Sequence, residues 1–348
     1  MGEKIKVMVV DDSAFMRRAL SNIINSDDNL LVVATAINGD DAIKKIPIVK
    51  PDVITLDVIM PKMNGLETLK YIMEHFPTPV VMVSSQTDEN SDVTVRCLEL
   101  GALDVVHKPS GSVSLDMYKK ENLIIEKIIH AAKANLNAHK EEKTPEILKS
   151  INKSNDSGIK NIVGLGISTG GPKTLLNIIP ALPEKLGAPV LIAQHMPENF
   201  TKSFADRLNE LSRIYVKEAE DGEDLKNNVV YIAKGGHQLL LNKGRHGYFL
   251  KVDKLPETIY KPSVDLLLSS IAENFNGKMI GIVMTGMGSD GSIGLKRLKD
   301  KGGYAIVQDK ETSVVCGMPC AARKVVKVDK VLPFNKIPEE IVKFLNNG

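Results

Sequence analysis

A glycine-rich stretch with one serine near its centre limits what this chain can fold into more than any other feature. It reads Gly164-Leu165-Gly166-Ile167-Ser168-Thr169-Gly170-Gly171-Pro172, between the apolar run Ile159–Val163 and a segment of helical spacing that starts at Lys173. Glycine tolerates the backbone conformations of a sharp turn. The stretch therefore predicts a strand, a tight turn that contains Ser168, and a helix.

The serine pattern favours a nucleophile over a nucleotide site. Gly166-Ile167-Ser168-Thr169-Gly170 fits the G-x-S-x-G pattern of a nucleophile elbow, although five residues alone are a weak signal. The free N–H groups and positive dipole end of the next helix would stabilise an oxyanion there. A dinucleotide fingerprint needs glycine where Thr169 stands, and Pro172 interrupts a P-loop pattern.

Length and composition predict two domains of an ordinary globular protein. The chain has 348 residues, of which 43% are hydrophobic and 25% charged. No apolar run is long enough to span a bilayer, and Ile5–Val10 is too short for the core of a signal peptide. We therefore expect a cytoplasmic protein that does not insert into membranes.

The small net charge of +2 hides two halves of opposite sign. Residues 1–130 contain 14 Lys and Arg against 19 Asp and Glu, whereas residues 161–348 contain 25 against 20. The halves could dock on each other, or the basic half could favour an acidic partner. Neither half is basic or aromatic enough to indicate nucleic-acid binding.

The chain has three cysteines, Cys97, Cys316 and Cys320. Cys316 and Cys320 could both bind a metal, but no second pair of ligands has the spacing of a zinc site. Buried or free thiols are therefore predicted.

Residues 1–130 alternate apolar runs with segments of helical periodicity. Five strands that alternate with five helices predict a doubly wound, flavodoxin-like parallel sheet. The predicted strands are Ile5–Val10, Leu31–Ala36, Val53–Leu56, Val80–Val83 and Asp104–His107, and the predicted helices span Ala14–Asn25, Asp40–Ile46, Gly65–His75 and Asn90–Leu100, with a last one from Leu115.

Polar side chains gather at the carboxyl ends of these strands, where ligands of such sheets bind. Asp11 and Asp12 follow the first strand, Asp57 the third, Ser84 the fourth and Lys108 the fifth. Three carboxylates in one crevice repel each other unless a cation joins them, and Mg2+ prefers oxygen ligands. The pocket is suited to a carboxylate that attacks phosphorus with the help of a metal.

Four stretches surround these residues: Val9-Val10-Asp11-Asp12-Ser13, Leu56 to Gly65, Val83-Ser84-Ser85 and His107-Lys108-Pro109. With them, this half resembles the receiver domain of two-component response regulators. The resemblance implies that Asp57 is phosphorylated by a histidine kinase, that Asp11 and Asp12 hold Mg2+ together with Asp57, and that Ser84 and Lys108 sense the phosphoryl group.

Two features bear on how the phosphoryl signal would reach the second half. Val105 stands where many receivers have an aromatic switch residue, which leaves the route of the signal open. Residues 131–158 are polar and have few apolar residues to bury, so we interpret them as a linker.

In the second half, three side chains are predicted at the carboxyl ends of strands. Ser168 follows the strand already described, His195 follows the apolar run Ala188–Gln194, and Asp290 lies on a glycine-rich turn after Met279–Met284. One sheet edge would then hold a nucleophile, its base and the acid that orients the base. The chain order differs from the Ser, Asp, His order of α/β-hydrolases.

Other residues compete for these roles. His237 is the rival base; it lies near a predicted hairpin, and we expect it close to the same rim. Ser263 looks like the N-cap of a helix. Asp221 and Asp224 lie in a polar stretch that is solvated by default.

Three stretches surround the candidate triad: Gly166-Ile167-Ser168-Thr169-Gly170-Gly171-Pro172, Gln194-His195-Met196-Pro197 and Met284-Thr285-Gly286-Met287-Gly288-Ser289-Asp290-Gly291. With them, the second half resembles the catalytic domain of the chemotaxis protein-glutamate methylesterase family, CheB. By that resemblance Ser168 is the nucleophile, His195 the base and Asp290 its orienter, while Thr169 and Met287 line the site and the Met287 N–H is an oxyanion donor.

The resemblance implies a receiver domain over residues 1–130 and a mainly parallel α/β methylesterase domain over residues 159–348. The implied activity is hydrolysis of glutamate methyl esters on methyl-accepting chemotaxis receptors, with deamidation of receptor glutamines. Both are acyl transfers through a serine, and no cofactor is needed in the catalytic half. Lys234 departs from the proline that the family often has there, which affects only a rim loop.

Two other functions stay open from sequence alone. The first is a response regulator whose second half binds a partner without catalysis. The second is a nucleotide-dependent oxidoreductase built on the glycine-rich turn, which Thr169 disfavours.

Overall fold

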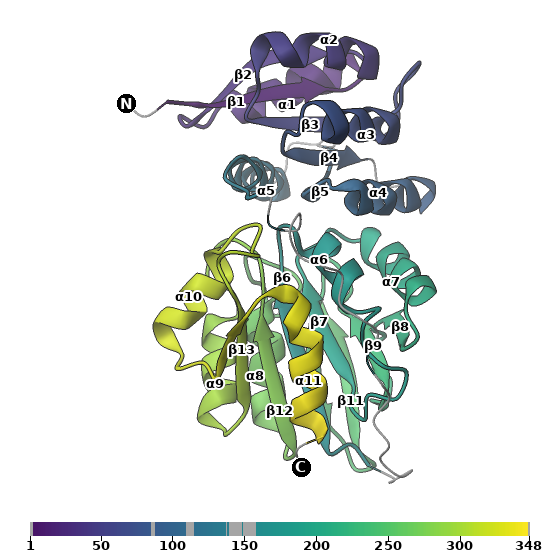
Figure 1. The fold of residues 1–348 in the computed structure, drawn as a ribbon, viewed down its shortest axis with the longest axis vertical. Coiled ribbons are helices and arrows are strands. Elements are labelled where there is room, and N and C mark those ends of the chain that lie inside the picture. Colours follow the sequence, from purple (N-terminus) through teal and green to yellow (C-terminus); the bar gives the residue numbers. More distant parts are fainter. Residues whose placement is uncertain are drawn as a thin grey trace. The chain divides into compact units, whose positions relative to one another are not determined.

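The computed structural model describes residues 3–84, 88–108, 115–136, 138, 148 and 158–346 (Figure 1). The chain divides into two compact units, Met1–Leu136 and Asn137–Gly348. Helix α5 of the first unit ends at Ala132, so the predicted linker begins inside that helix. Most of the remaining linker lies outside the described residues.

The first unit is a five-stranded parallel sheet with strand order β2-β1-β3-β4-β5. Helix α1 packs on α5, and α3 packs on both α2 and α4. The predicted flavodoxin-like sheet is confirmed. Its elements are β1 (Ile5–Val10), α1 (Ala14–Asn25), β2 (Leu30–Ala36), α2 (Gly39–Val49), β3 (Val53–Asp57), α3 (Gly65–His75), β4 (Val80–Ser84), α4 (Asp88–Leu100), β5 (Asp104–His107) and α5 (Leu115–Ala132).

The second unit contains a seven-stranded sheet of order β14-β13-β12-β6-β7-β9-β8, with every neighbouring pair parallel. A separate antiparallel hairpin, β10–β11, completes the predicted architecture. The elements are β6 (Asn161–Ile167), α6 (Gly171–Ile178), β7 (Val190–Gln194), α7 (Phe200–Leu211), β8 (Tyr215–Glu218), β9 (Val229–Ile232), β10 (Gln238–Lys243), β11 (Tyr248–Asp253), α8 (Val264–Asn274), β12 (Lys278–Val283), α9 (Ser292–Asp300), β13 (Tyr304–Gln308), α10 (Gly317–Val325), β14 (Lys330–Leu332), η1 (Phe334–Lys336) and α11 (Ile337–Asn346).

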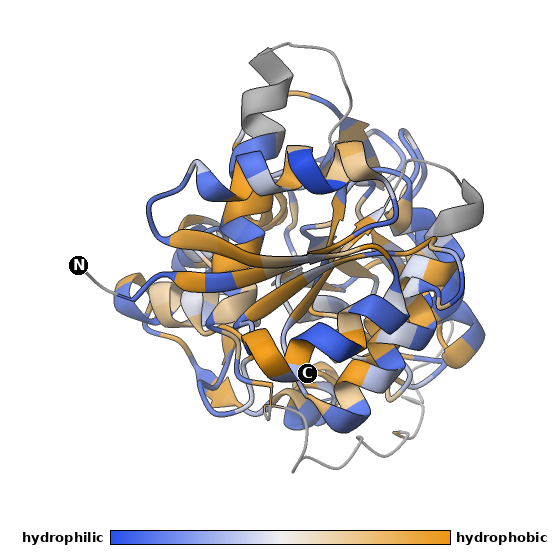
Figure 2. Cartoon of the chain, turned by 90° about the horizontal axis from the view of Figure 1, so that it is seen from above, coloured by the Kyte–Doolittle hydropathy of each residue, from blue (hydrophilic) through white to orange (hydrophobic). Residues whose placement is uncertain are grey.

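The central strands are apolar because helices cover both faces of a parallel sheet. Every residue of β3, β6 and β7 is buried. The strands are largely hydrophobic in Figure 2, while the helices alternate between hydrophobic and hydrophilic positions. Among the described residues, no helix combines the length and the apolar character needed to cross a membrane.

Two glycines of β6 let helix α8 approach the sheet closely. A Cβ on Gly166 would lie 1.9 Å from Val264 Cγ1, and one on Gly164 would lie 2.6 Å from Ile271 Cδ1. These glycines therefore belong to the strand, which continues to Ile167, and not to the turn expected there. The close approach brings the first residues of α8 to the carboxyl end of the sheet.

Candidate active site

The Ser168 turn is formed by main-chain hydrogen bonds directly after β6. Ser168 N–H donates to the Thr285 carbonyl at 2.9 Å, and Gly171 N–H donates to the Ser168 carbonyl at 2.7 Å. Gly170 has φ of 75°, a left-handed conformation that favours glycine, and α6 begins at the next residue. Ser168 is thus held at the N-terminal end of α6 and stays 8% exposed.

The residues after Met284 form a second turn against the serine. A Cβ on Gly286 would lie only 2.7 Å from Ser168 Cβ. Thr285 Oγ1 donates to the Thr169 carbonyl at 3.0 Å, and Thr169 is 1% exposed. Among the hydrogen bonds of the described residues, none uses the N–H of Met287. Its role as an oxyanion donor stays a prediction.

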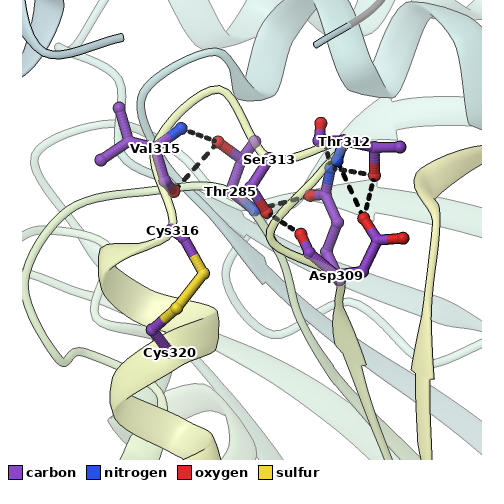
Figure 3. Close-up of a disulfide and its surroundings, with 8 residues drawn as sticks. Thr285, Asp309, Thr312, Ser313, Val315, Cys316 and Cys320 are labelled. Carbon is purple, nitrogen blue, oxygen red and sulfur yellow. Dashed lines mark hydrogen bonds between the residues drawn. A yellow bond between two sulfur atoms is a disulfide. The ribbon is translucent and has the colours of Figure 1, made fainter. Parts of the chain in front are cut away.

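Residues 315–318, which lead into α10, support this second turn, and Figure 3 shows the contacts between Val315 and Thr285. Val315 N–H donates to Thr285 Oγ1 at 3.0 Å, Gly286 N–H to the Val315 carbonyl at 2.9 Å, and Met318 N–H to the Gly286 carbonyl at 2.7 Å. Cys316, in the same segment, is joined to Cys320 by a disulfide.

The prediction of free or buried thiols is therefore wrong for Cys316 and Cys320. Cys316 is the N-cap of α10 and Cys320 lies one helical turn later, which brings their sulfur atoms together. The prediction is confirmed for Cys97, which is free and buried, and burial raises the pKa of its thiol to about 12.

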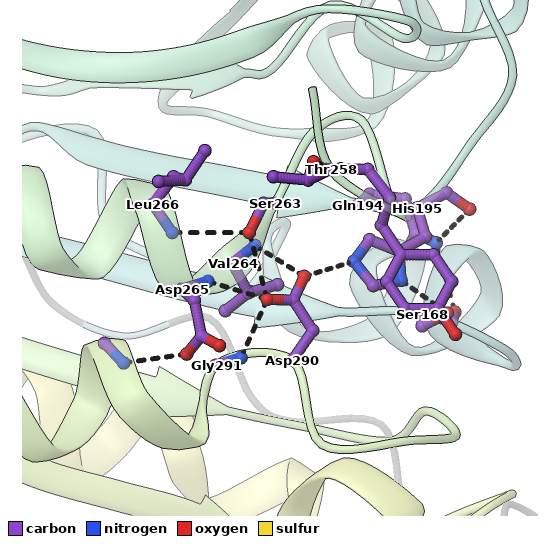
Figure 4. Close-up of polar contacts among 12 residues, drawn as sticks. Ser168, Gln194, His195, Thr258, Ser263, Val264, Asp265, Leu266, Asp290 and Gly291 are labelled. Atoms are coloured by element: carbon purple, nitrogen blue, oxygen red, sulfur yellow. Dashed lines mark hydrogen bonds and ion pairs between the residues drawn. The ribbon is translucent and has the colours of Figure 1, made fainter. Parts of the chain in front are cut away.

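Ser168, His195 and Asp290 form a continuous hydrogen-bonded chain (Figure 4). His195 Nδ1 lies 3.1 Å from Ser168 Oγ, and His195 Nε2 lies 2.9 Å from Asp290 Oδ2. An ionised carboxylate only accepts hydrogen bonds, so Nε2 must hold the proton in the neutral ring. Nδ1 then has its lone pair toward Ser168, as a base requires.

The N-terminus of α8 holds the Asp290 carboxylate. Backbone N–H groups of Val264, Asp265 and Gly291 donate to it at 2.8, 2.9 and 3.1 Å, and Ser263 Oγ donates at 3.0 Å. Burial alone would raise the pKa of Asp290, but the hydrogen bond and charge of His195 and these N–H groups outweigh it and lower the pKa. Ser263 is also the N-cap of α8, as predicted.

A second cluster lies at the carboxyl end of the first sheet. Lys108 Nζ is 2.9 Å from Asp11 Oδ2 and 2.8 Å from Asp57 Oδ2. Burial raises the pKa of Asp57 to about 6, against the hydrogen bond and charge of Lys108, and the Asp11 carboxylate adds to the rise. Ser84 is fully buried, and its hydroxyl accepts from Thr94 Oγ1 at 3.4 Å.

The acidic residues of this cluster fit a divalent cation. Carboxylate oxygens of Asp11, Asp12 and Asp57 lie within 4.8 Å of one another, and Asp12 is exposed. An all-oxygen set of this kind suits Mg2+, which keeps several waters and uses few carboxylates. The raised pKa of Asp57 indicates that Lys108 alone does not offset the burial of this carboxylate.

Comparison with known proteins agrees with both clusters. A family described as CheB methylesterase matches residues 163–341, and one described as response regulator receiver domain matches residues 7–117. A protein-glutamate methylesterase/protein-glutamine glutaminase of Pyrococcus horikoshii is 42% identical, covering 99% of this chain and 94% of the relative. This chain belongs to the CheB methylesterase family.

Other relatives support the same assignment. The enzyme of the same name from Geobacillus kaustophilus is 46% identical, covering 98% of this chain and 99% of its own length. The crystal structure of the Thermotoga maritima CheB methylesterase catalytic domain is 45% identical with a TM-score of 0.52, covering 54% of this chain and all of that one. The CheB match includes Ser168, His195 and Asp290, and the receiver match includes Asp57.

Within this CheB-type unit, the polar contacts of the rival base are with a main-chain carbonyl and a glutamate. His237 Nδ1 lies 3.0 Å from the Gly235 carbonyl and 3.9 Å from Glu198 Oε1. The polar contacts of Ser168 and Asp290 among the described residues do not include it. His195 is therefore the better candidate for the base.

Sequence reasoning missed one neighbour of His195. The Tyr260 ring stacks on the imidazole with 4.4 Å between ring centroids and 12° between planes. Tyr260 lies in the connection between β11 and α8, which has no periodic pattern. The only signal was its position three residues before the N-cap Ser263.

Magnesium is expected to raise the melting temperature of the unit that contains Asp57, because the cation relieves repulsion among the three carboxylates. At a concentration one hundred times the Kd, binding to the folded state alone contributes about 2.7 kcal/mol. Scanning calorimetry of the full chain, with Mg2+ or with a chelator, measures the shift. Asp12→Asn should reduce it and the exposed Asp28→Asn should not; equal shifts in both variants would argue against the site.

Proposed function

We propose that this protein is a phosphorylation-activated serine hydrolase that removes methyl groups from glutamate methyl esters on the cytoplasmic helices of chemoreceptors. We also propose that it deamidates receptor glutamines. The observation that supports this best is the chain of hydrogen bonds from Asp290 through His195 to Ser168, in a family whose curated members are named for both activities. The alternative of a non-enzymatic output domain gives no reason for that chain.

The proposed reaction begins with a proton transfer. Ser168 Oγ attacks the ester carbonyl carbon while His195 Nδ1, 3.1 Å away, accepts the hydroxyl proton. The ring then bears a positive charge, which the ionised Asp290 stabilises through Nε2. The acid stays ionised because α8 supplies three of its donors and Gly291 a fourth.

The negative oxygen of the tetrahedral intermediate needs donors beside Ser168. The Met287 N–H is one candidate. The preceding residue, Gly286, packs against Ser168 and accepts a hydrogen bond from Met318 N–H of α10. Thr169 contacts the same turn, because its carbonyl accepts a hydrogen bond from Thr285 Oγ1. Preorganised donors of this kind usually contribute more than any other single feature to the rate of acyl transfer.

Collapse of the intermediate completes the acylation. His195 returns its proton to the leaving oxygen, methanol departs, and water then hydrolyses the acyl-serine by the same route. A glutamine amide passes through the same acyl-serine and releases ammonia. Besides substrate and water, the proposed steps use the side chains and main chain of this unit.

The first unit would act as the regulatory receiver. We propose that Asp57 accepts a phosphoryl group from a chemotaxis histidine kinase, and that bound Mg2+ would offset charge on the reacting oxygens. Lys108 already contacts the Asp57 carboxylate, so a phosphoryl group there would change its partners. The domain limits proposed are 1–130 for the receiver, 131–158 for the linker and 159–348 for the methylesterase.

The proposal is tested on membranes that contain methylated chemoreceptors. The full chain should release methanol, and a small phosphodonor with Mg2+ should increase the rate. Mass spectrometry of receptor peptides would locate the demethylated glutamates and any deamidated glutamines. No methanol release, together with no labelling of Ser168 by a fluorophosphonate, would favour the partner-binding alternative.

A further inference from the structure

A short connecting segment covers one face of the proposed catalytic base. Residues 256–263, which we call the strap, form most of the connection between β11 and α8. From the strap, Tyr260 places its ring parallel to the His195 imidazole, with 4.4 Å between centroids. The edges of the same imidazole contact Ser168 and Asp290, so the stack adds a contact in a direction that the hydrogen bonds do not restrain.

The strap is held by one buried amide side chain. Gln238, at the start of β10, is 0% exposed. Its Nε2 donates to the Pro256 carbonyl at 3.2 Å and to Thr258 Oγ1 at 2.8 Å, while its Oε1 accepts from Ser263 N–H at 2.8 Å. These bonds fix the strap on both sides of Tyr260.

A further bond fixes Tyr260 itself. Thr258 Oγ1 donates to the Tyr260 carbonyl at 2.5 Å, so the hydroxyl that Gln238 holds also holds the main chain of Tyr260. The neighbouring side chain behaves differently, since Ile259 is 88% exposed. The hydrogen bonds of Gln238 and Thr258 therefore hold the main chain in the position that directs the Tyr260 ring to the imidazole.

We infer that Tyr260 is a positioning residue for His195, which restrains the tilt of the imidazole and favours its positively charged form during acyl transfer. The inference rests on the proposed function. A stacked aromatic ring stabilises a cation on its face. Such a contact typically shifts the equilibrium toward the charged form by a few-fold to about tenfold. Because the charged imidazole exists only between the two proton transfers, the benefit falls on turnover more than on substrate binding.

In the described part of the chain, few charged groups surround His195, so a pH profile of the reaction can test the effect of Tyr260 on the imidazole. Among the described residues, the charged group in contact with the imidazole is Asp290, on the turn before α9. The other polar neighbours are the hydroxyl of Ser168, after β6, and the ring of Tyr260, from the strap. Changing Tyr260 alone leaves the ion pair with Asp290 in place.

A purely structural role makes a different prediction. A residue that only fills space is replaced well by leucine, which keeps an apolar side chain but lacks an aromatic face. A positioning residue is replaced well by phenylalanine and poorly by leucine. The comparison of Tyr260→Phe with Tyr260→Leu therefore separates the two roles, and Ile259→Ala in the same strap is the matched control.

Methanol release by the full chain should show this pattern. Tyr260→Leu should lower kcat roughly fivefold with little change in KM, and should shift the acid limb of the pH profile on the order of half a pH unit lower. The shift is downward because the charged ring loses its stacking partner, so the neutral base persists to lower pH. Tyr260→Phe and Ile259→Ala should retain both the wild-type kcat and the wild-type acid limb.

A second readout keeps this test separate from that of the proposed function. The rate at which a fluorophosphonate labels Ser168 depends on the base but needs no receptor, and it should fall in Tyr260→Leu alone. Melting temperatures of all three variants identify any loss of folding. Equal labelling rates and equal acid limbs for the leucine and phenylalanine variants would overturn the inference, even if receptor demethylation is established.

Discussion

Replacing Ser168 by alanine is expected to lower methanol release from methylated receptors by about 10^4-fold or more. The variant lacks the oxygen that forms the acyl bond, while the main-chain hydrogen bonds that build the turn remain. His195→Ala should be similarly impaired. Asp290→Asn should lower methanol release less than these two variants do, because the acid orients the base and takes no proton itself.

A serine of similar burial provides the control for that experiment. Ser269 lies on α8 and is 6% exposed, against 8% for Ser168. Ser269→Ala should keep most of the activity and show the same folded spectrum. Near-wild-type methanol release by Ser168→Ala would disprove the assignment, and Ser263, whose hydroxyl contacts Asp290, would be examined next.

Replacing Asp57 by asparagine is expected to abolish phosphorylation by a small phosphodonor in the presence of Mg2+. The carboxylate supplies the attacking oxygen, and an amide is not a nucleophile of comparable strength. The variant keeps a side chain of nearly the same size at a buried position that is 3% exposed. Intact-mass measurement before and after incubation with the phosphodonor reports the incorporation directly.

The exposed Asp28→Asn is the matched control, since it removes the same charge from the same unit. It should be phosphorylated like the wild type. Unchanged incorporation in Asp57→Asn would move the acceptor to Asp11 or Asp12, which share the cluster. In the wild type, the phosphodonor should also raise methanol release, and it should not do so in Asp57→Asn.

Much of the fold could be predicted because each strand is a short apolar run followed by a polar or glycine-rich turn. This periodicity located β1, α1, α3 and β5 at the bounds observed. The carboxyl ends of parallel strands lie on one edge, which is why Ser168, His195 and Asp290 could be expected together. Their catalytic roles stay predictions, although their contacts are now described.

Other features depend on contacts between segments that have no sequence pattern in common. The strap has no periodicity, so nothing in the sequence placed Tyr260 on His195. Ser263 was expected as an N-cap, but its bond to Asp290 spans 27 residues and depends on how α8 packs. The four-residue spacing of Cys316 and Cys320 indicates proximity only once a helix is known to start between them.

The Asp290 carboxylate also has a consequence for cooperativity. It accepts from Ser263, Val264 and Asp265 at the start of α8 and from Gly291 just before α9, so a single side chain links the two helices. Local unfolding at the start of either helix would remove hydrogen-bond donors from the Asp290 carboxylate. The carboxylate could then no longer hold the His195 imidazole in place. The amide hydrogens of Val264, Asp265 and Gly291 should therefore exchange with solvent as one group, and their common rate would report how often the whole site is open.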